Sequence, residues 1–183
     1  MKGVAPKADV YAYRGCWELE SGDTQCNTLS LARALDGVAQ SDASILNLSL
    51  SGPKDLLLDR LVDRLVSQGV FVVAAFDPKR PSENRFPTRR DGVLIVRAEH
   101  MNQDFNSEFT APGKRIVVLP TKGYSLMTGH SVATAYTSGV LALIVQKQTH
   151  IADRNRSDVS DLLEAQLSRN DVSSVDDLLK ITL

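Results

Sequence analysis

The sequence predicts an α/β fold in three layers, with a mainly parallel sheet covered by helices on both faces. Short apolar runs with strand-like composition alternate along the chain with stretches of helical periodicity. Several of the runs are apolar at every position, which is typical of strands buried on both faces. Turn residues separate many of these stretches, so the alternation indicates strand-helix-strand units.

The first half of the chain contains three expected elements. Residues 10–14 (VYAYR) favour a strand. Apolar side chains at helical spacing then predict a helix over 31–38, with Asn27 or Thr28 as its N-cap. Residues 45–50 (ILNLSL) predict a buried strand that ends in a turn at Ser51-Gly52-Pro53.

The middle of the chain continues the alternation. A helix is expected over 58–65, and Gly69 follows it at the C′ position. Residues 70–75 (VFVVAA) predict a fully buried strand, and 77–92 a polar loop. Two further strands are expected at 93–96 and 116–119.

The last third predicts helices. Residues 131–146 are apolar and rich in small side chains, which favours a buried helix, and 158–167 favour an amphipathic one. Residues 175–181 are expected to add a turn or two. We expect one domain over 1–183, with 149–183 as a C-terminal helical segment.

Composition excludes several function classes. The 183 residues include 21 basic and 22 acidic side chains, so the net charge of −1 offers no global field for nucleic acid or anionic lipid. No apolar run reaches the roughly 18 residues that span a bilayer, and the first residues resemble no signal peptide. With 3 His and 2 Cys, we expect neither a metal site nor a cofactor.

Ser131 is the candidate nucleophile. It stands in Gly129-His130-Ser131-Val132-Ala133, where a long apolar helix is expected to begin. Free N–H groups of a first helical turn are suited to stabilising an oxyanion. By itself the pattern fits an ordinary N-cap serine as well.

Four stretches in order give the chain a family resemblance. They are GVAP at 3–6, NLSLSGP at 47–53, FP with GVLIV at 86–96, and APG with GHSVA and Gly139-Val140 at 111–140. The chain resembles the C-terminal part of a subtilisin-like serine peptidase catalytic domain, the subtilase family. The resemblance covers 3–148 and implies the subtilisin-like fold, incomplete at its N-terminus.

The resemblance implies peptide-bond hydrolysis through an acyl-enzyme on Ser131, with peptides or proteins as substrates. The substrate-binding edge would be Ser49, Leu50, Ser51 and Gly52. Ala74, Ala75 and Phe76 would form the facing wall of the pocket that takes the substrate side chain, where Phe76 would narrow the space.

Three departures from the family pattern affect the expected activity. The family's D-[ST]-G and H-G-[TS]-H motifs precede GVAP and do not occur here, so we expect little or no peptidase activity from this chain alone. His100, His130 and His150 are expected to be surface or loop residues. The Asn of the family that donates to the oxyanion is replaced by Asp77 or Pro78: proline donates nothing, an ionised Asp77 would repel the oxyanion, and a protonated Asp77 could donate to it. The family's S-P-H after the nucleophile becomes Thr134-Ala135-Tyr136.

Two groups of side chains leave alternatives open. Cys16 and Cys26 bracket a polar loop, where we favour a disulfide over two free thiols; a disulfide would place the parent protein outside the cytoplasm, in the periplasm or secreted. A basic run in the 77–92 loop is expected to be solvated, although beside the substrate pocket it would favour acidic substrates. Its members are Lys79, Arg80, Arg85, Arg89 and Arg90.

Two other functions compete with the peptidase hypothesis. One is an inactive subtilase-like module that binds extended peptides or a protein partner through the Ser49–Gly52 edge. The other, a nucleotide-binding domain, is weak because no Gly-rich phosphate loop follows a strand. If the family's upstream strand and helix are missing, the sheet has an open position, which predicts a homodimer, strand exchange or an N-terminal subtilase segment bound in trans.

Overall fold

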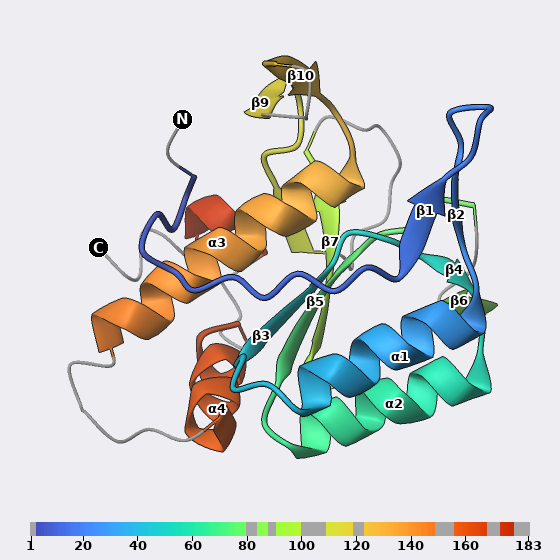
Figure 1. Ribbon diagram of the computed structural model, residues 1–183. Coiled ribbons are helices and arrows are strands. Elements are labelled where there is room, and N and C mark those ends of the chain that lie inside the picture. The colour runs from blue at the N-terminus through green and yellow to red at the C-terminus, as the bar shows by residue number, and fades with distance from the viewer. Residues whose placement is uncertain are drawn as a thin grey trace.

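A four-stranded parallel sheet lies between two layers of helices (Figure 1). The computed structural model describes residues 3–79, 84–87, 91–99, 109–118, 123–148, 156–167 and 173–177. The sheet order is β3-β5-β7-β8, with the strands at Ile45–Leu48, Phe71–Ala75, Val93–Ala98 and Phe109–Ala111. The predicted three-layer α/β fold is confirmed.

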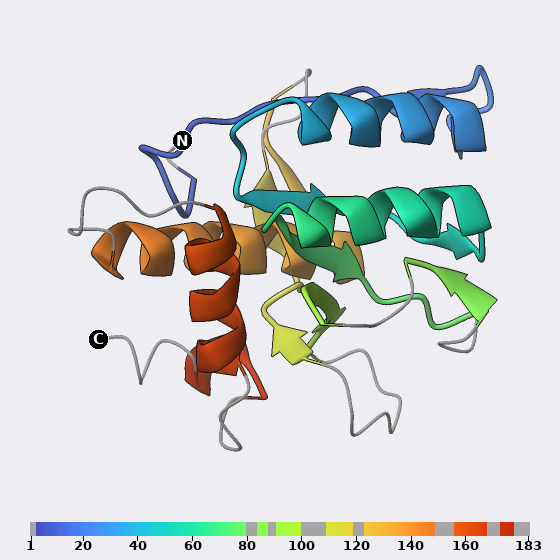
Figure 2. The same cartoon turned by 90° about the horizontal axis from the view of Figure 1, so that it is seen from below.

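The two helical layers bury opposite faces of the sheet (Figure 2). Helices α1 (Thr28–Ala39) and α2 (Leu56–Ser67) form one core with Val72 and Ala74 of β5. Helices α3 (His130–Gln148) and α4 (Arg156–Leu167) form the other with Phe71 and Val73. Alternate residues of β5 therefore supply both cores, and every residue of this strand is buried.

Local capping chemistry sets where the first two helices begin. Asn27 is the N-cap of α1, because its side chain accepts a hydrogen bond from the backbone N–H of Ser30 at 2.8 Å. Asp55 caps α2 by accepting from the N–H groups of Leu57 and Leu58. Gly69 follows α2 with a φ of 78°, in the expected C′ position.

The predicted strand at 10–14 is wrong. These residues form no strand, and the side chain of Val10 is 84% exposed. The segment runs from α3 towards α1 (Figure 1) and pairs with no strand of the described sheet. Val4 packs against Gly139 of α3 and Tyr13 against Gly37 of α1, where a larger residue would collide. Without a neighbouring strand to accept its backbone hydrogen bonds, the segment stays irregular.

Three short antiparallel pairs lie outside the main sheet. They join β1 (Cys16–Glu18) to β2 (Thr24–Cys26), β4 (Gly52–Pro53) to β6 (Arg85–Phe86), and β9 (Ile116–Val118) to β10 (Ser125–Met127). The strand expected at 116–119 thus belongs to a hairpin, and β8 takes the place of the fourth parallel strand. Sequence reasoning missed β8 because FTA is too short to form a distinct apolar run.

The C-terminal part packs on the α3 side of the sheet. Leu163 of α4 and Val175 are fully buried in the core that α3 forms with the sheet. Residues 175–177 are helical, whereas the rest of the turn expected over 175–181 lies outside the described residues. His100, His150, Leu119, Arg80, Arg89 and Arg90 also lie outside them. Within the described chain, no helix has the length and hydropathy needed to cross a membrane.

Candidate active site

Ser131 lies in the first turn of α3, and its side chain is exposed. The helix begins at His130, so the backbone N–H of Ser131 has no carbonyl one turn earlier in the helix to bond with. Within the described residues this N–H donates to no other group. An exposed hydroxyl and a free amide at the positive end of a helix form the minimal set for attack on a carbonyl and stabilisation of the resulting oxyanion.

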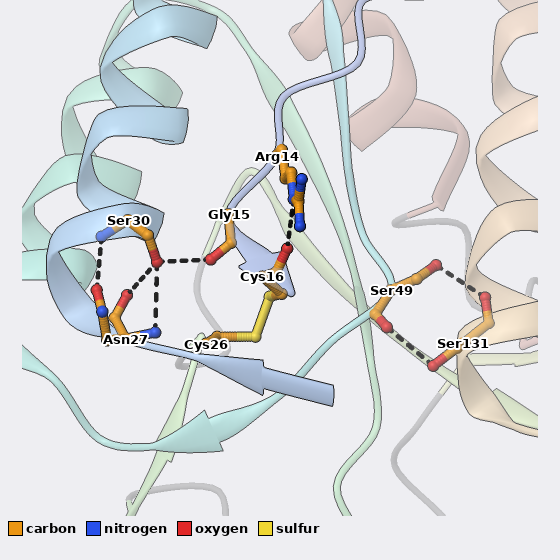
Figure 3. The surroundings of a disulfide bond; sticks show 8 residues. All are labelled: Arg14, Gly15, Cys16, Cys26, Asn27, Ser30, Ser49 and Ser131. Atoms are coloured by element: carbon orange, nitrogen blue, oxygen red, sulfur yellow. Dashed lines mark hydrogen bonds between the residues drawn. A yellow bond between two sulfur atoms is a disulfide. The ribbon is translucent and has the colours of Figure 1, made fainter. Parts of the chain in front are cut away.

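Ser49 holds Ser131 by two reciprocal hydrogen bonds (Figure 3). The Ser131 hydroxyl donates to the Ser49 carbonyl at 2.9 Å, and the Ser49 hydroxyl donates to the Ser131 carbonyl at 2.8 Å. Ser49 follows the end of β3 and leads to Gly52 in β4. The structure therefore brings together the start of α3 and the segment in which the substrate-binding edge was expected.

Two polar side chains behind this pair were missed by sequence reasoning. The Asn47 amide nitrogen donates to the Ser49 hydroxyl at 3.0 Å. The Asn47 amide oxygen accepts from the Ser138 hydroxyl at 3.0 Å, which ties β3 to α3. A signal was present, because Asn47 interrupts the apolar run ILNL and Ser138 lies two helical turns after Ser131.

His130 is half-buried at the first residue of α3, and its ring makes specific contacts. Its Nδ1 accepts a hydrogen bond from the backbone N–H of Ala98, at the end of β7, at 3.0 Å. Its ring packs edge-on against Phe76, with centroids 5.4 Å apart. Burial lowers the pKa of His130 below its ordinary 6.5; Arg97 lowers it further, and Asp77 opposes the change. His130 is no base for Ser131, because its acceptor nitrogen is bonded to Ala98.

The residues expected to form the facing wall of the substrate pocket are buried. Ala74 and Ala75 are buried at the end of β5, and Phe76 directly after them is 6% exposed. The Arg85 guanidinium carbon lies 5.0 Å from the centre of the Phe76 ring. Arg85 is 2% exposed, so the expectation of a solvated basic run is wrong for this residue, whereas Lys79 is exposed.

The two candidate replacements for the oxyanion Asn have different environments. Asp77 is buried, and its Oδ1 accepts from the backbone N–H of Lys79 at 2.9 Å. Pro78 is exposed and has no N–H to donate. In place of the family's S-P-H, Thr134 is buried and its hydroxyl donates to the His130 carbonyl at 2.8 Å. This local bond closes the first turn of α3.

Cys16 and Cys26 form a disulfide that closes the β1–β2 hairpin (Figure 3). The two residues are direct partners in the antiparallel register. The hairpin is fixed to α1 next to it, because the Ser30 hydroxyl donates to the Gly15 carbonyl at 2.6 Å. Among the residues that the structure describes, no three His, Cys, Asp or Glu side chains are grouped to hold a metal ion.

Comparison with known proteins agrees with this arrangement. The sequence profile described as "Subtilase family" matches residues 1–177. The chain belongs to the subtilase family. The resemblance found in the sequence motifs is thereby confirmed.

Individual subtilases cover most of this chain but are themselves matched over only part of their length. M-protease of Shouchella clausii (strain KSM-K16) is 30% identical over 155 residues, which are 79% of this chain and 40% of the relative. The major intracellular serine protease of Bacillus subtilis (strain 168) is 29% identical over 171 residues, 85% of this chain and 53% of the relative. The chain thus spans about half the length of these relatives, or less.

A solved subtilase structure shows the same fold. A cold adapted subtilisin-like serine proteinase superposes with a TM-score of 0.64 and 28% identity, over 84% of this chain and 59% of that one. Sequence and structure therefore agree that this subtilase chain corresponds to a portion of a subtilisin-like catalytic domain.

Proposed function

We propose that this chain is the nucleophile-bearing portion of a subtilisin-like serine endopeptidase. Ser131 attacks the carbonyl carbon of a peptide bond, forms an acyl-enzyme and releases the amine product; water then hydrolyses the ester. The observation that carries the proposal is the exposed Ser131 hydroxyl at the start of α3, hydrogen-bonded to Ser49.

The surrounding residues take the roles that acyl transfer requires. The free N–H of Ser131 donates to the oxyanion. The stretch Ser49, Leu50, Ser51 and Gly52 pairs with an extended peptide, and Ala74, Ala75 and Phe76 form the facing wall. Asp77 and Pro78 lie in the proposed oxyanion region, where proline has no N–H to donate and the Asp77 Oδ1 already accepts from the Lys79 N–H.

The reaction also requires a proton acceptor for the Ser131 hydroxyl. Within the described residues this hydroxyl donates to the carbonyl of Ser49, which is no base. The acceptor nitrogen of His130 is bonded to the N–H of Ala98. The proposal therefore assigns the imidazole and its orienting carboxylate to an upstream subtilase segment. General base catalysis typically contributes about 10²–10⁴-fold to such a reaction.

A fluorophosphonate probe tests both parts of this proposal. We expect slow labelling of the chain by itself, and fast labelling of Ser131 after addition of a subtilase segment with the D-[ST]-G and H-G-[TS]-H motifs. Ser131→Ala should abolish labelling. Ser125→Ala is the matched control, because Ser125 is an exposed serine of β10 outside the site.

Two outcomes would contradict the proposal in different ways. Fast labelling of the chain alone would show that Ser131 needs no added base. No labelling with the added segment, in a protein that binds it, would reject Ser131 as a nucleophile and favour a non-catalytic peptide-binding module.

We further propose that the outer edge of β3 binds a strand, supplied by an N-terminal subtilase segment in trans or by a second copy of the chain. In the described sheet β3 pairs only with β5, and the irregular 10–14 segment exposes Val10 and Tyr11. Unpaired edges and exposed apolar side chains favour association. Light scattering that finds a monomer at all concentrations, together with no binding of the segment, would contradict this.

We also propose where the parent protein resides and that residues 1–183 form one domain. The Cys16–Cys26 disulfide supports an extracytoplasmic parent protein, although one relative carries the name intracellular serine protease. Leu163 and Val175 pack in the same core as α3, which supports one domain over 1–183.

A further inference from the structure

We propose that His130 is a positioning residue for Ser131, and that it fixes the start of α3 only while its imidazole is neutral. The inference rests on the proposed role of Ser131 as nucleophile. His130 acts on Ser131 through the backbone that the two neighbours share.

The hydrogen bond with Ala98 lets His130 fix the position of the first turn of α3. Ala98 is the last residue of β7 and His130 is the first residue of α3, so the 3.0 Å hydrogen bond joins the helix directly to the sheet. Ser131 is the next residue along the chain. A shift of the His130 backbone therefore moves the Ser131 amide and hydroxyl together.

This hydrogen bond requires a particular protonation state. The backbone N–H of Ala98 donates and Nδ1 accepts, so the proton of the neutral ring is on Nε2. An imidazolium carries a proton on both nitrogens and accepts nothing. Protonation would therefore set an N–H group against an N–H group and break the connection between β7 and α3.

The charges around the ring favour the neutral form. Arg97 comes from β7 and Asp77 from the end of β5, and their effects on the pKa of His130 oppose each other. Arg85 lies over the Phe76 ring, against which His130 packs edge-on. The first turn of α3 has no acidic residue, and its N-terminal dipole disfavours a cation. Burial is the largest influence, and the net effect lowers the pKa of His130.

The contacts on the other side of Ser131 do not titrate in the same range. Ser49 and Ser131 exchange two hydrogen bonds between hydroxyls and carbonyls, neither of which changes charge between about pH 5 and pH 8. Gly129 adds a backbone bond to the Gly113 carbonyl at 2.9 Å. A pH-dependent change at the start of α3 is thus attributable to the histidine.

NMR on the full chain tests the inference without any need for catalysis. The ring ¹⁵N spectrum of His130 should show the proton on Nε2 and a pKa below 6.5. Below that pKa, the exchange protection of the Ala98 amide should fall by about tenfold per pH unit, and the Ser131 amide resonance should shift with the same midpoint.

His130→Gln is the matched variant, because its side-chain oxygen is an acceptor that does not titrate. We expect it to keep Ala98 protected throughout the range and to remove the Ser131 shift. In His130→Leu, the protection of Ala98 should be low at every pH. If neither variant folds, the tautomer and the common midpoint in the wild-type chain still decide the question.

The inference is overturned if the proton is on Nδ1, if Ser131 does not follow the titration of His130, or if His130→Gln shows the same pH dependence as the wild type. Probe labelling is a separate measurement. Failure of Ser131 to react with the added segment rejects the proposed function, whereas the NMR result judges the contact between His130 and Ala98.

Discussion

Two stretches of similar composition have opposite structures in this chain. VYAYR at 10–14 and FVVAA at 71–75 are both rich in residues that favour strands. The second is β5, buried at every position between β3 and β7, whereas the first is irregular and largely exposed. Strand formation here is decided by the presence of neighbouring strands, because only they satisfy the backbone groups of an extended segment.

The largest effect should come from the disulfide next to the irregular stretch. Cys16→Ser with Cys26→Ser opens a loop with a sequence separation of 10. The chain-entropy estimate predicts a loss of about 3 kcal/mol in the free energy of unfolding. Urea denaturation measures the loss, and hydrogen exchange should show it first in 10–18 and not in β5. A uniform loss of protection across β5 would contradict the distinction between the two stretches.

A pair of identical substitutions compares the stretches directly. Val73→Ala removes two methyl groups from a fully buried position in β5 and should cost about 2–3 kcal/mol. Val10→Ala makes the same change at a side chain that is 84% exposed and should cost less than about 0.5 kcal/mol. Both are measured by urea denaturation. Equal losses would mean that 10–14 is packed in solution as a strand.

Acidification should lower the stability of the hydrogen bond between His130 and the end of β7, and should leave residues 10–14 unchanged. The pKa of His130 is lowered in the folded chain, so its contribution to stability is complete above its unfolded pKa of about 6.5 and is lost as pH falls through the folded value. The urea midpoint of the wild type should therefore fall relative to His130→Gln on acidification. Parallel midpoints of the two proteins at every pH would exclude this contribution.

The smallest effect concerns a surface contact of the irregular stretch. The hydrogen bond with Asp42 and the charge of that carboxylate raise the pKa of the exposed Tyr11 phenol above 10.0. Asp42→Asn should bring the pKa of Tyr11 back toward its ordinary value in an NMR titration. Tyr11→Phe should leave the free energy of unfolding unchanged within about 0.5 kcal/mol. A larger loss would show that Tyr11 anchors the segment.

The same contrast explains which parts of the fold were predictable. The helices and the central strands have strong local signals, such as the Asn27 cap of α1 and the uniformly apolar run of β5. The strand at 10–14 was predicted wrongly because composition carries no information about pairing partners. β6 and β8 were missed because strands of two and three residues are too short for periodicity.

Sequence reasoning reached the main site residue but not its surroundings. Ser131 stands out because several motifs surround it in the family's order. The hydrogen bond of His130 with Ala98 joins positions 32 residues apart, and the buried Arg85 lies over the ring of Phe76. Both follow from tertiary packing, and no local pattern in the sequence indicates them.

The bond between the Ser131 hydroxyl and the Ser49 carbonyl bears on what limits reactivity. Turning the hydroxyl away from that carbonyl costs about 0.5–1.5 kcal/mol, the net value of an ordinary hydrogen bond, which slows a reaction roughly tenfold or less. Transfer of its proton to an imidazole accounts for a factor of about 10²–10⁴. Engineering a faster variant by freeing the serine would therefore gain little, whereas delivering a base to it would gain far more.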